Sequence, residues 1–413
     1  MDRTPGVGGR RDLTSGVEDR PSLAEVFGAS LRLGLTSFGG PIAHIAYFRR
    51  EYVERRRWLD EARFADLLAL SQALPGPASS QLGIAIGTLR AGRLGGIVSW
   101  LGFTLPSAII LVAFALLTES ADLTDAGWVR GLKLAAVAVV AQAVLVMWRT
   151  LAPDVPRSIV VVTATIAALA IASPAVQVAI IAVGALVGFV LLPDASGDLA
   201  PSGPRRLSGP RWAMACLVAF AVLLVGLPLL REAVASQAIA LFGAFYRAGS
   251  LVFGGGHVVL PLLNEAVVVN GWVSEDHFLA GYGVAQAVPG PLFTFAGFLG
   301  ASMTLPPTGV PGAVIALVAI FLPSFLLVWG LLPFWDVLRG RSDVRRALTG
   351  VNAAVVGLLL AALITPVSTS AVSGPLDALI AAGAALLLVA FRFPPWAVVL
   401  ITAVTTEVMT RLT

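Results

Sequence analysis

The stretch Leu33-Gly34-Leu35-Thr36-Ser37-Phe38-Gly39-Gly40-Pro41 decides how this chain is read, because a related stretch recurs later. The glycines and the phenylalanine of 34–40 recur in 249–255 at a constant offset of 215. A second element, Ser71-Gln72-Ala73-Leu74-Pro75-Gly76-Pro77, recurs as Ala285-Gln286-Ala287-Val288-Pro289-Gly290-Pro291 at an offset of 214. Matches that keep their order over about 100 residues indicate an internal repeat.

The repeat predicts a chain of four parts. They are a disordered cytoplasmic arm at 1–22, a first half at 23–192, a linker loop plus a connecting transmembrane helix at 193–235, and a second half at 236–413. The arm is polar and contains no apolar run, so it is not expected to act as a cleavable signal peptide.

Composition predicts a membrane protein. Hydrophobic residues make up 57% of the chain and charged residues 13%, with a mean hydropathy of +0.87. Soluble domains are about one quarter charged. Many segments are apolar around the whole helix and approach the roughly 20 residues that cross a bilayer. The sequence therefore predicts an all-α polytopic membrane protein.

Cysteine content and charge exclude several kinds of site. Cys216 is the only cysteine, which excludes an internal disulfide and any multi-cysteine metal or cluster site. The net charge of +4 lies in loops between apolar segments, as expected for a positive-inside bias rather than for nucleic-acid binding. We expect no cofactor, no metal and no nucleic-acid partner.

The loop charges predict that the two halves have opposite orientations. The loop 49–57 carries five arginines, whereas its counterpart 264–276 has three acidic residues and no basic one. Basic loops remain on the cytoplasmic side, and the connecting helix between the halves reverses the second one. Two inverted-topology repeats follow. A parallel duplication whose loop charges differ by chance is the alternative.

Glycine and proline predict broken or re-entrant helices. The apolar stretches 23–48 and 64–89 are interrupted at Phe38–Pro41 and Leu74–Pro77, where proline removes a donor and disfavours helix in the residue before it. Each half is thus expected to contain two broken hairpins followed by four fuller spans.

The helix breaks predict the binding site. Irregular backbone at membrane depth occurs where it lines a hydrated cavity, and a new half-helix presents free N–H groups and a positive dipole end. Starts after Gly40, Pro77, Gly256 and Pro291 are expected to converge on one oxyanion. Neighbouring side chains complete the predicted substrate-binding set, which is Ser37, Gly39, Gly40, Gln72, Gly76, Ser79, Gln81, Gly254, Gly255, Gly256, His257, Gln286, Gly290, Thr294, Lys133 and Asn352; Ser80 lies beside them.

Each of these residues has a structural alternative. Amides and hydroxyls beside the breaks also satisfy carbonyls that the prolines expose. Lys133, the only lysine, lies within an apolar run and either faces the path or extends to the membrane interface; its repeat partner is Asn352. His44 and His277 have no metal-ligand partners at a suitable spacing, so both are interpreted as ordinary polar residues. Glu265 and Asp66 are candidates for proton coupling.

The paired Phe-Gly-Gly and Pro-Gly-Pro elements resemble those of the chromate ion transporter family in its long-chain, two-domain form. The resemblance covers nearly the whole chain beyond the arm. It implies export of chromate across the bacterial inner (plasma) membrane by a multi-pass protein that confers chromate resistance. Sulfate has the same tetrahedral shape and charge, so a sulfate or other oxyanion transporter is an alternative, and so is a passive anion channel.

An enzyme is the remaining functional class. An intramembrane enzyme acting on a lipid-linked anion should carry clustered carboxylates or histidines, and the sequence shows no such cluster. A phosphate-cradling G-x-x-x-x-G-K-[ST] motif is also absent, as expected for a secondary transporter. The expected partners are the oxyanion and membrane lipid, and the sequence leaves a homodimer open.

Overall fold

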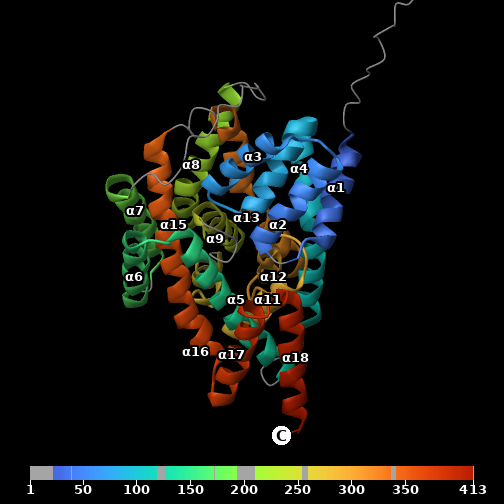
Figure 1. Cartoon of the computed structure of the whole chain (residues 1–413), viewed down its shortest axis with the longest axis vertical. Coiled ribbons are helices and arrows are strands. Elements are labelled where there is room, and N and C mark those ends of the chain that lie inside the picture. The colour runs from blue at the N-terminus through green and yellow to red at the C-terminus, as the bar shows by residue number, and fades with distance from the viewer. Residues whose placement is uncertain are drawn as a thin grey trace, which may run out of the picture.

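The computed structural model describes residues 22–38, 40–118, 126–171, 173–192, 210–253, 259–335 and 341–412. All regular elements in these ranges are helices (Figure 1). Five of them are long and apolar enough to cross a membrane, and several shorter apolar helices pack among them. The predicted all-α polytopic membrane fold is confirmed.

The first half contains two short hairpins and then longer helices. The π-helical turn η1 continues α2 and the chain then turns back into α3. The elements are α1 (Leu23–Thr36), α2 (Gly40–Arg49), η1 (Arg50–Arg55), α3 (Glu61–Ala73), α4 (Ala78–Thr118), α5 (Gly127–Leu151), α6 (Val155–Ala170) and α7 (Pro174–Leu191). Ala91 and Gly92 have non-helical backbone angles, so α4 is two helices joined at a kink.

The second half repeats this order after the connecting helix α8 (Pro210–Ala233). The π-helical turn η3 again follows a short helix, at the position equivalent to η1. The elements are α9 (Gln237–Leu251), α10 (Val259–Leu263), η3 (Asn264–Val268), α11 (Glu275–Ala287), η4 (Leu292–Thr294), α12 (Phe295–Ala301), α13 (Gly309–Leu331), η5 (Leu332–Phe334), α15 (Ser342–Ala362), η6 (Leu363–Ser368), α16 (Thr369–Ala371), α17 (Pro375–Val389) and α18 (Pro395–Leu412).

Equivalent helices begin in the same way in both halves. The Asp60 side chain accepts a hydrogen bond from the Arg63 N–H at 2.7 Å at the start of α3. The Ser274 side chain accepts one from the His277 N–H at 3.3 Å at the start of α11. Such caps satisfy amides that have no partner within the helix, so the two hairpins turn at matched positions.

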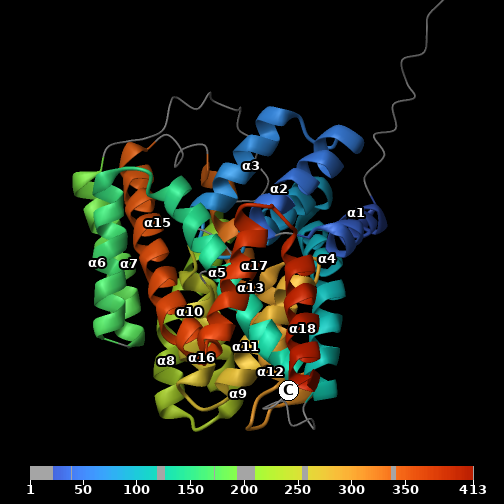
Figure 2. The same ribbon diagram turned by 60° about the horizontal axis from the view of Figure 1, so that its bottom comes forward.

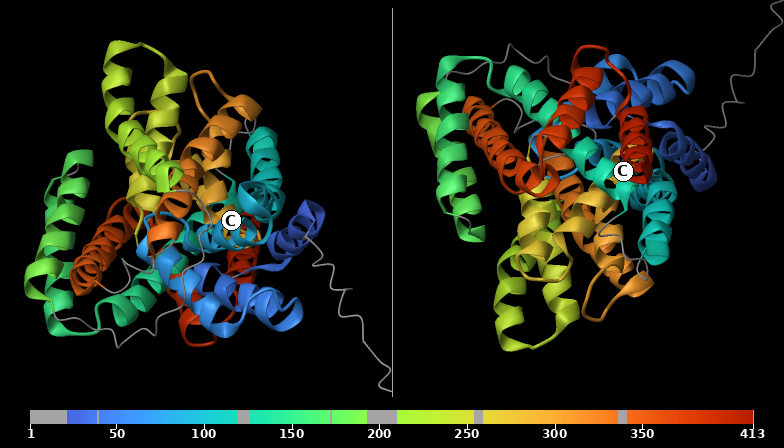
Figure 3. Two further views of the ribbon diagram at one scale, coloured as in Figure 1. Left: turned by 90° about the horizontal axis from the view of Figure 1, so that it is seen from above. Right: turned by 90° about the horizontal axis from the view of Figure 1, so that it is seen from below.

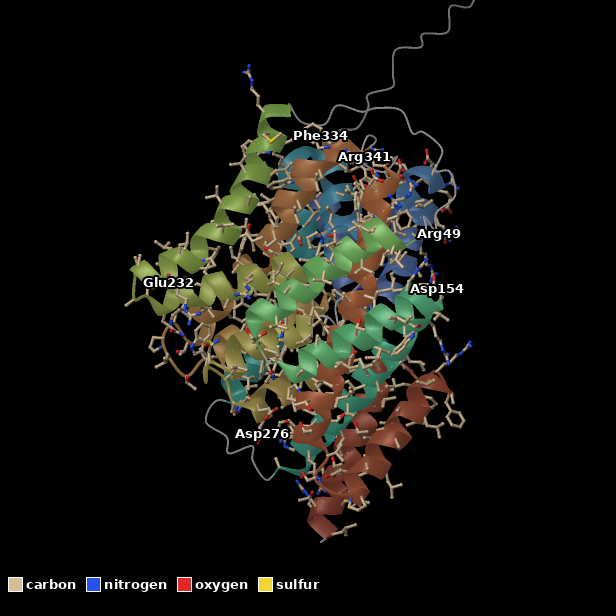
Figure 4. The ribbon with its side chains drawn as sticks, turned by 90° about the vertical axis from the view of Figure 1, so that its left-hand side faces the viewer. Arg49, Asp154, Glu232, Asp276, Phe334 and Arg341 are labelled. Atoms are coloured by element: carbon tan, nitrogen blue, oxygen red, sulfur yellow. The ribbon has the colours of Figure 1, made fainter. Side chains whose placement is uncertain are left out.

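The short hairpins of the two halves lie at opposite ends of the molecule. In Figure 2, α1, α2 and α3 lie toward the top, and α9 and α12 lie toward the bottom. The side chains in Figure 4 follow the same division, because Arg49 and Arg341 lie at the upper right while Glu232 and Asp276 lie on the left and at the bottom. Arg49, at the start of the basic loop 49–57, and Asp276, at the end of its acidic counterpart 264–276, therefore lie at different ends of the molecule.

Close backbone contacts hold the first helix of each half against a later helix of the same half. These pairs are α1 with α4 and α9 with α13. A Cβ added at Gly34 of α1 would lie 2.7 Å from the Gly102 carbonyl oxygen of α4, and one added at Gly249 of α9 would lie 2.1 Å from the Ile320 carbonyl oxygen of α13. Only glycine permits these contacts. Viewed from above and below, α6 and α7 form a pair at one edge and α8 lies at another (Figure 3).

Candidate functional site

Each of the two Pro-Gly-Pro turns contacts the other half of the chain. Gly76 has a φ of +121° and Gly290 a φ of +102°, values that favour glycine. Since proline has no N–H, the glycine is the only donor within each Pro-Gly-Pro. The Gly76 N–H donates to the Val252 carbonyl at the end of α9 at 2.6 Å, and the Gly290 N–H donates to the Ser37 carbonyl at the end of α1 at 3.0 Å.

These two hydrogen bonds are equivalent under the internal repeat, because Ser37 corresponds to Val252 and Gly76 to Gly290. Each ties the second break of one half to the first break of the other half. We call the two turns, residues 74–77 and 288–291, with the ends of α1 and α9 that they contact, the turn crossing. The crossing brings predicted site residues from both halves together.

A serine that directly follows a proline within a helix lies against each turn. Ser324 follows Pro323 in α13, and its Oγ would lie 2.8 Å from a Cβ at Gly76. Ser107 follows Pro106 in α4, and its Oγ would lie 2.8 Å from a Cβ at Gly290. The Gln81 side chain also stabilises the first turn. Its Nε2 donates to the Pro75 carbonyl at 2.6 Å and to Ser324 Oγ at 3.4 Å.

Gln81 Oε1, a buried acceptor at the first turn, has no hydrogen-bond partner within the described residues, and neither have four further buried polar atoms around the crossing. They are Ser37 Oγ, Ser80 Oγ, His44 Nε2 and Gln286 Nε2. All four are able to donate a hydrogen bond, and a buried donor without a partner costs about 1–3 kcal/mol. Buried polar groups are normally satisfied by a protein group, by water or by a bound ligand, so these atoms mark a position at which a polar ligand is able to bind.

Two of these groups are held in place by a second contact. His44 Nδ1 lies 3.3 Å from Ser79 Oγ, and the imidazole packs edge-on against Phe103 with ring centroids 5.5 Å apart. The Gln286 side chain hydrogen-bonds that of Tyr282. His44 also interacts with the backbone of Ser37, and the Nε2 atoms of His44 and Gln286 have no partner at hydrogen-bond geometry among the described residues.

Helices begin beside the crossing, as the sequence predicts. Gly40, with a φ of +76°, starts α2. The first helical hydrogen bond of α4 runs from the Gln81 N–H to the Pro77 carbonyl at 2.9 Å, so the amides of 78–80 precede the helical ladder. The 3₁₀ turn η4 starts directly after Pro291. The start predicted after Gly256 lies outside the described residues.

Several predicted site residues take no part in the crossing. Gln72 is exposed on α3, so the matched glutamines Gln72 and Gln286 differ in their surroundings. The Lys133 ammonium pairs with the Asp276 carboxylate at the start of α11. Asn352 is half-buried on α15. The Thr294 hydroxyl donates to the Pro291 carbonyl at 2.7 Å. Gly39, Gly254, Gly255, Gly256 and His257 lie outside the described residues.

Sequence reasoning assigned no role to four residues at the crossing. His44 was interpreted as an ordinary polar residue, yet it is 1% exposed. Ser107 and Ser324 carry a usable signal, because a Pro-Ser pair recurs at matched positions in both halves. Tyr282 carries none, since only the folded chain shows its contact with Gln286. Among the described residues, no group of three or more His, Cys, Asp or Glu side chains is arranged to hold a metal ion.

Comparisons with known proteins find similarity to chromate transport proteins. A family model described as "Chromate transporter" matches residues 24–189 and again residues 239–406. A chromate transport protein of Pseudomonas aeruginosa is 30% identical over 357 residues, which covers 84% of this chain and 81% of that protein. A chromate transport protein of Cupriavidus metallidurans is 29% identical over 367 residues, 87% of this chain and 86% of that protein. No solved structure matches.

Proposed function

The chain belongs to the chromate transporter family, and from this premise we propose that it is a secondary transporter that exports the chromate dianion across the inner membrane and so confers chromate resistance. A potential of about 100 mV, negative inside, is worth roughly 2.3 kcal/mol per charge, so expelling a dianion gains about 4.6 kcal/mol. The membrane potential alone is then a sufficient driving force. The proposal includes no chemical step.

The observation that carries the proposal is the group of four unpartnered donors around the turn crossing. A tetrahedral dianion presents four acceptor oxygens, and it needs donors from several directions. Hydroxyl, amide and imidazole N–H groups supply these donors without a fixed positive charge. Neutral donors suit a transported ion because a site must bind firmly enough to admit the ion and weakly enough to release it.

We also propose that the two halves are inverted copies that change their relative tilt around this site. Two observations support the inversion. Short hairpins of equivalent sequence lie at opposite ends of the molecule, and the loop 49–57 is basic where its counterpart 264–276 is acidic. The family model matches each half once, which supports the duplication. Inverted repeats with interrupted helices at mid-membrane are typical of secondary transporters.

The test is transport by purified protein in phospholipid vesicles. Vesicles are loaded with radiolabelled chromate, a potassium diffusion potential of either sign is imposed, and efflux is measured. We expect efflux that saturates with concentration, shows counterflow and accelerates when the inside is negative. Flux without saturation or counterflow would identify a channel. Preference for sulfate in competition would change the substrate, and indifference to both anions would reject the proposal.

Variants at the crossing test the site. We expect Ser80→Ala and Gln286→Ala to weaken chromate affinity by about tenfold or more, because a hydrogen bond to a charged group is worth roughly 1.5–3 kcal/mol. Ser302→Ala is the matched control, since the Ser302 hydroxyl is also buried without a partner but lies at the end of α12. An equal loss in all three variants would indicate that only folding is affected.

A further inference from the structure

A cavity with several polar side chains in its lining lies between the connecting helix α8 and the hairpin of α9 with α10 and η3. Its volume is 420 Å³. Small residues of α9 form one wall, and the apolar side of α8 forms another. The polar groups that line it are Gln177, Arg231, Glu232, Arg247, Glu265 and Asn270. Glu232 marks the rim of this α8–α9 cavity on the left of Figure 4.

The two arginines of the cavity have N–H groups that donate no hydrogen bond to another described residue. Arg231 is exposed at the rim, with its guanidinium 5.6 Å from the centre of the Trp272 ring. Arg247 is half-buried, and it makes no salt bridge or hydrogen bond with another described residue. It lies near enough to Glu265 for the two charges to attract each other. A guanidinium carries five N–H donors in a rigid fork, and both arginines line the cavity.

Glu265 is the only acidic group in the inner part of the cavity among the described residues. Its side chain accepts a hydrogen bond from the Gln177 amide of α7 and attracts Arg247 of α9. The Gln177 Oε1 is buried and has no partner. The Asn270 amide is committed to the backbone carbonyls of Glu265 and Ala266, at 3.3 and 2.9 Å. Glu232 of α8 is exposed at the rim.

The equivalent position in the first half is built differently. Glu51 of η1 corresponds to Glu265, and it pairs with both Arg55 and Arg56, at 3.1 and 2.6 Å. Arg32 of α1 corresponds to Arg247 and is exposed, and no helix that precedes α1 is among the described residues. The same sequence element is therefore a closed ion-pair cluster in the first half and an open arginine-lined cavity in the second.

We propose that the α8–α9 cavity binds a tetrahedral oxyanion group through Arg247 and Arg231, with Glu265 as the nearby carboxylate that attracts Arg247 and competes with the oxyanion for it. A bidentate guanidinium contact suits both a carboxylate and a tetrahedral oxyanion, so the two compete for the same fork. The oxyanion group comes from one of two sources, a free ion or the phosphate of a membrane phospholipid. The inference stands independently of the ion site at the turn crossing.

Equilibrium binding tests the inference directly. Radiolabelled sulfate is titrated into the full-length protein in detergent, and phospholipid retained by the same preparation is measured by native mass spectrometry. For Arg247→Gln we expect affinity for sulfate, or the occupancy of retained phospholipid, to fall about tenfold to hundredfold, since a charged hydrogen-bonded contact is lost. Glu265→Gln is expected to raise the same quantity, because it removes the competing charge and keeps the side-chain shape.

The controls separate binding from folding. Arg32→Gln removes the exposed repeat counterpart of Arg247, and Glu232→Gln removes a carboxylate from the rim; both should leave binding within about twofold. A rise with Glu265→Gln cannot come from partial unfolding. The inference is overturned if neither anion source responds to Arg247→Gln, or if Glu265→Gln weakens binding.

The same experiment distinguishes the two binding regions. Sulfate binding that depends on Arg247 but persists in Ser80→Ala assigns the ion to the α8–α9 cavity. If chromate transport fails in vesicles while this binding remains, the proposed function is rejected and the inference about the cavity is supported. If transport proceeds and the cavity variants bind sulfate and phospholipid as the wild type does, only the inference about the cavity is rejected.

Discussion

Replacing Gly76 by alanine should destabilise the turn crossing from two directions. An L-residue held at the φ of +121° costs about 1–3 kcal/mol in backbone strain. The new Cβ would lie 2.6 Å from Gln81 Nε2, and the amide must move away and release the Pro75 carbonyl. That hydrogen bond is worth roughly 0.5–1.5 kcal/mol. Together these terms predict a loss of about 2–4 kcal/mol in the free energy of unfolding.

A double variant separates the two terms. The Cβ would also lie 2.8 Å from Ser324 Oγ, so Ser324→Gly gives it room on that side while the backbone strain stays. We therefore expect Gly76→Ala with Ser324→Gly to recover a minority of the lost stability. The measurement is equilibrium unfolding in mixed detergent micelles, followed by far-ultraviolet circular dichroism, with chromate transport recorded on the same preparations.

Gly383→Ala is the matched control. A Cβ there meets nothing within 4 Å, and the residue lies within α17, where alanine is the better helix former. Its free energy of unfolding should be unchanged or raised by up to about 1 kcal/mol. If Gly76→Ala proves as stable as the wild type and transports normally, then the left-handed turn is not a structural requirement and the account of the crossing is wrong.

Three further outcomes follow from the same contacts. Gly350→Ala should reduce folded yield severely, because its Cβ would lie 2.0 Å from a backbone oxygen of α7; a normal yield and melting temperature would contradict this. Asp377→Ala removes a fully buried carboxylate that accepts from Arg130 at 2.7 Å, and thermal unfolding should show a loss of about 1–3 kcal/mol. Exchanging Lys133 and Asp276 should restore stability that each single alanine variant loses, and a double-mutant cycle without coupling would show that the pair contributes nothing.

Local chemistry explains which parts of the fold were predictable. The helix breaks at 38–41 and 74–77 were predicted from glycine and proline, whose effects act on their own backbone and on the residue before them. The Pro-Gly-Pro turns and the starts of α2 and α4 lie where these residues place them. The π-helical turns η1 and η3 were not predicted. They carry no glycine or proline, and what distinguishes them from ordinary helix is packing.

Long-range contacts explain which parts of the site were missed. The partner of the Gly76 N–H is a carbonyl in the other half, and no feature of either stretch alone reveals it. Lys133 was assigned to the substrate path or to the membrane interface, and its pairing with Asp276 was not foreseen because Asp276 appeared only as one of several loop charges. The matched glutamines were treated as equivalent, yet Gln72 is exposed and Gln286 is half-buried. Repeat symmetry equates sequence positions but not their surroundings.

The two hydrogen bonds of the turn crossing restrict how the halves are able to move. Each joins a break in one half to a break in the other, and each uses the only donor that its Pro-Gly-Pro possesses. A motion that separated the turns would leave a buried amide and a buried carbonyl without partners at the same moment, which costs about 1–3 kcal/mol for each group. A tilt of one half against the other that pivots at the crossing keeps both bonds intact. The outer ends of α3 and α11, which lie farthest from the turns along each helix, then move most while the four unpartnered donors stay close to the pivot. An ion bound near the pivot is then open first to one side of the membrane and then to the other, and the ion itself moves only a short distance.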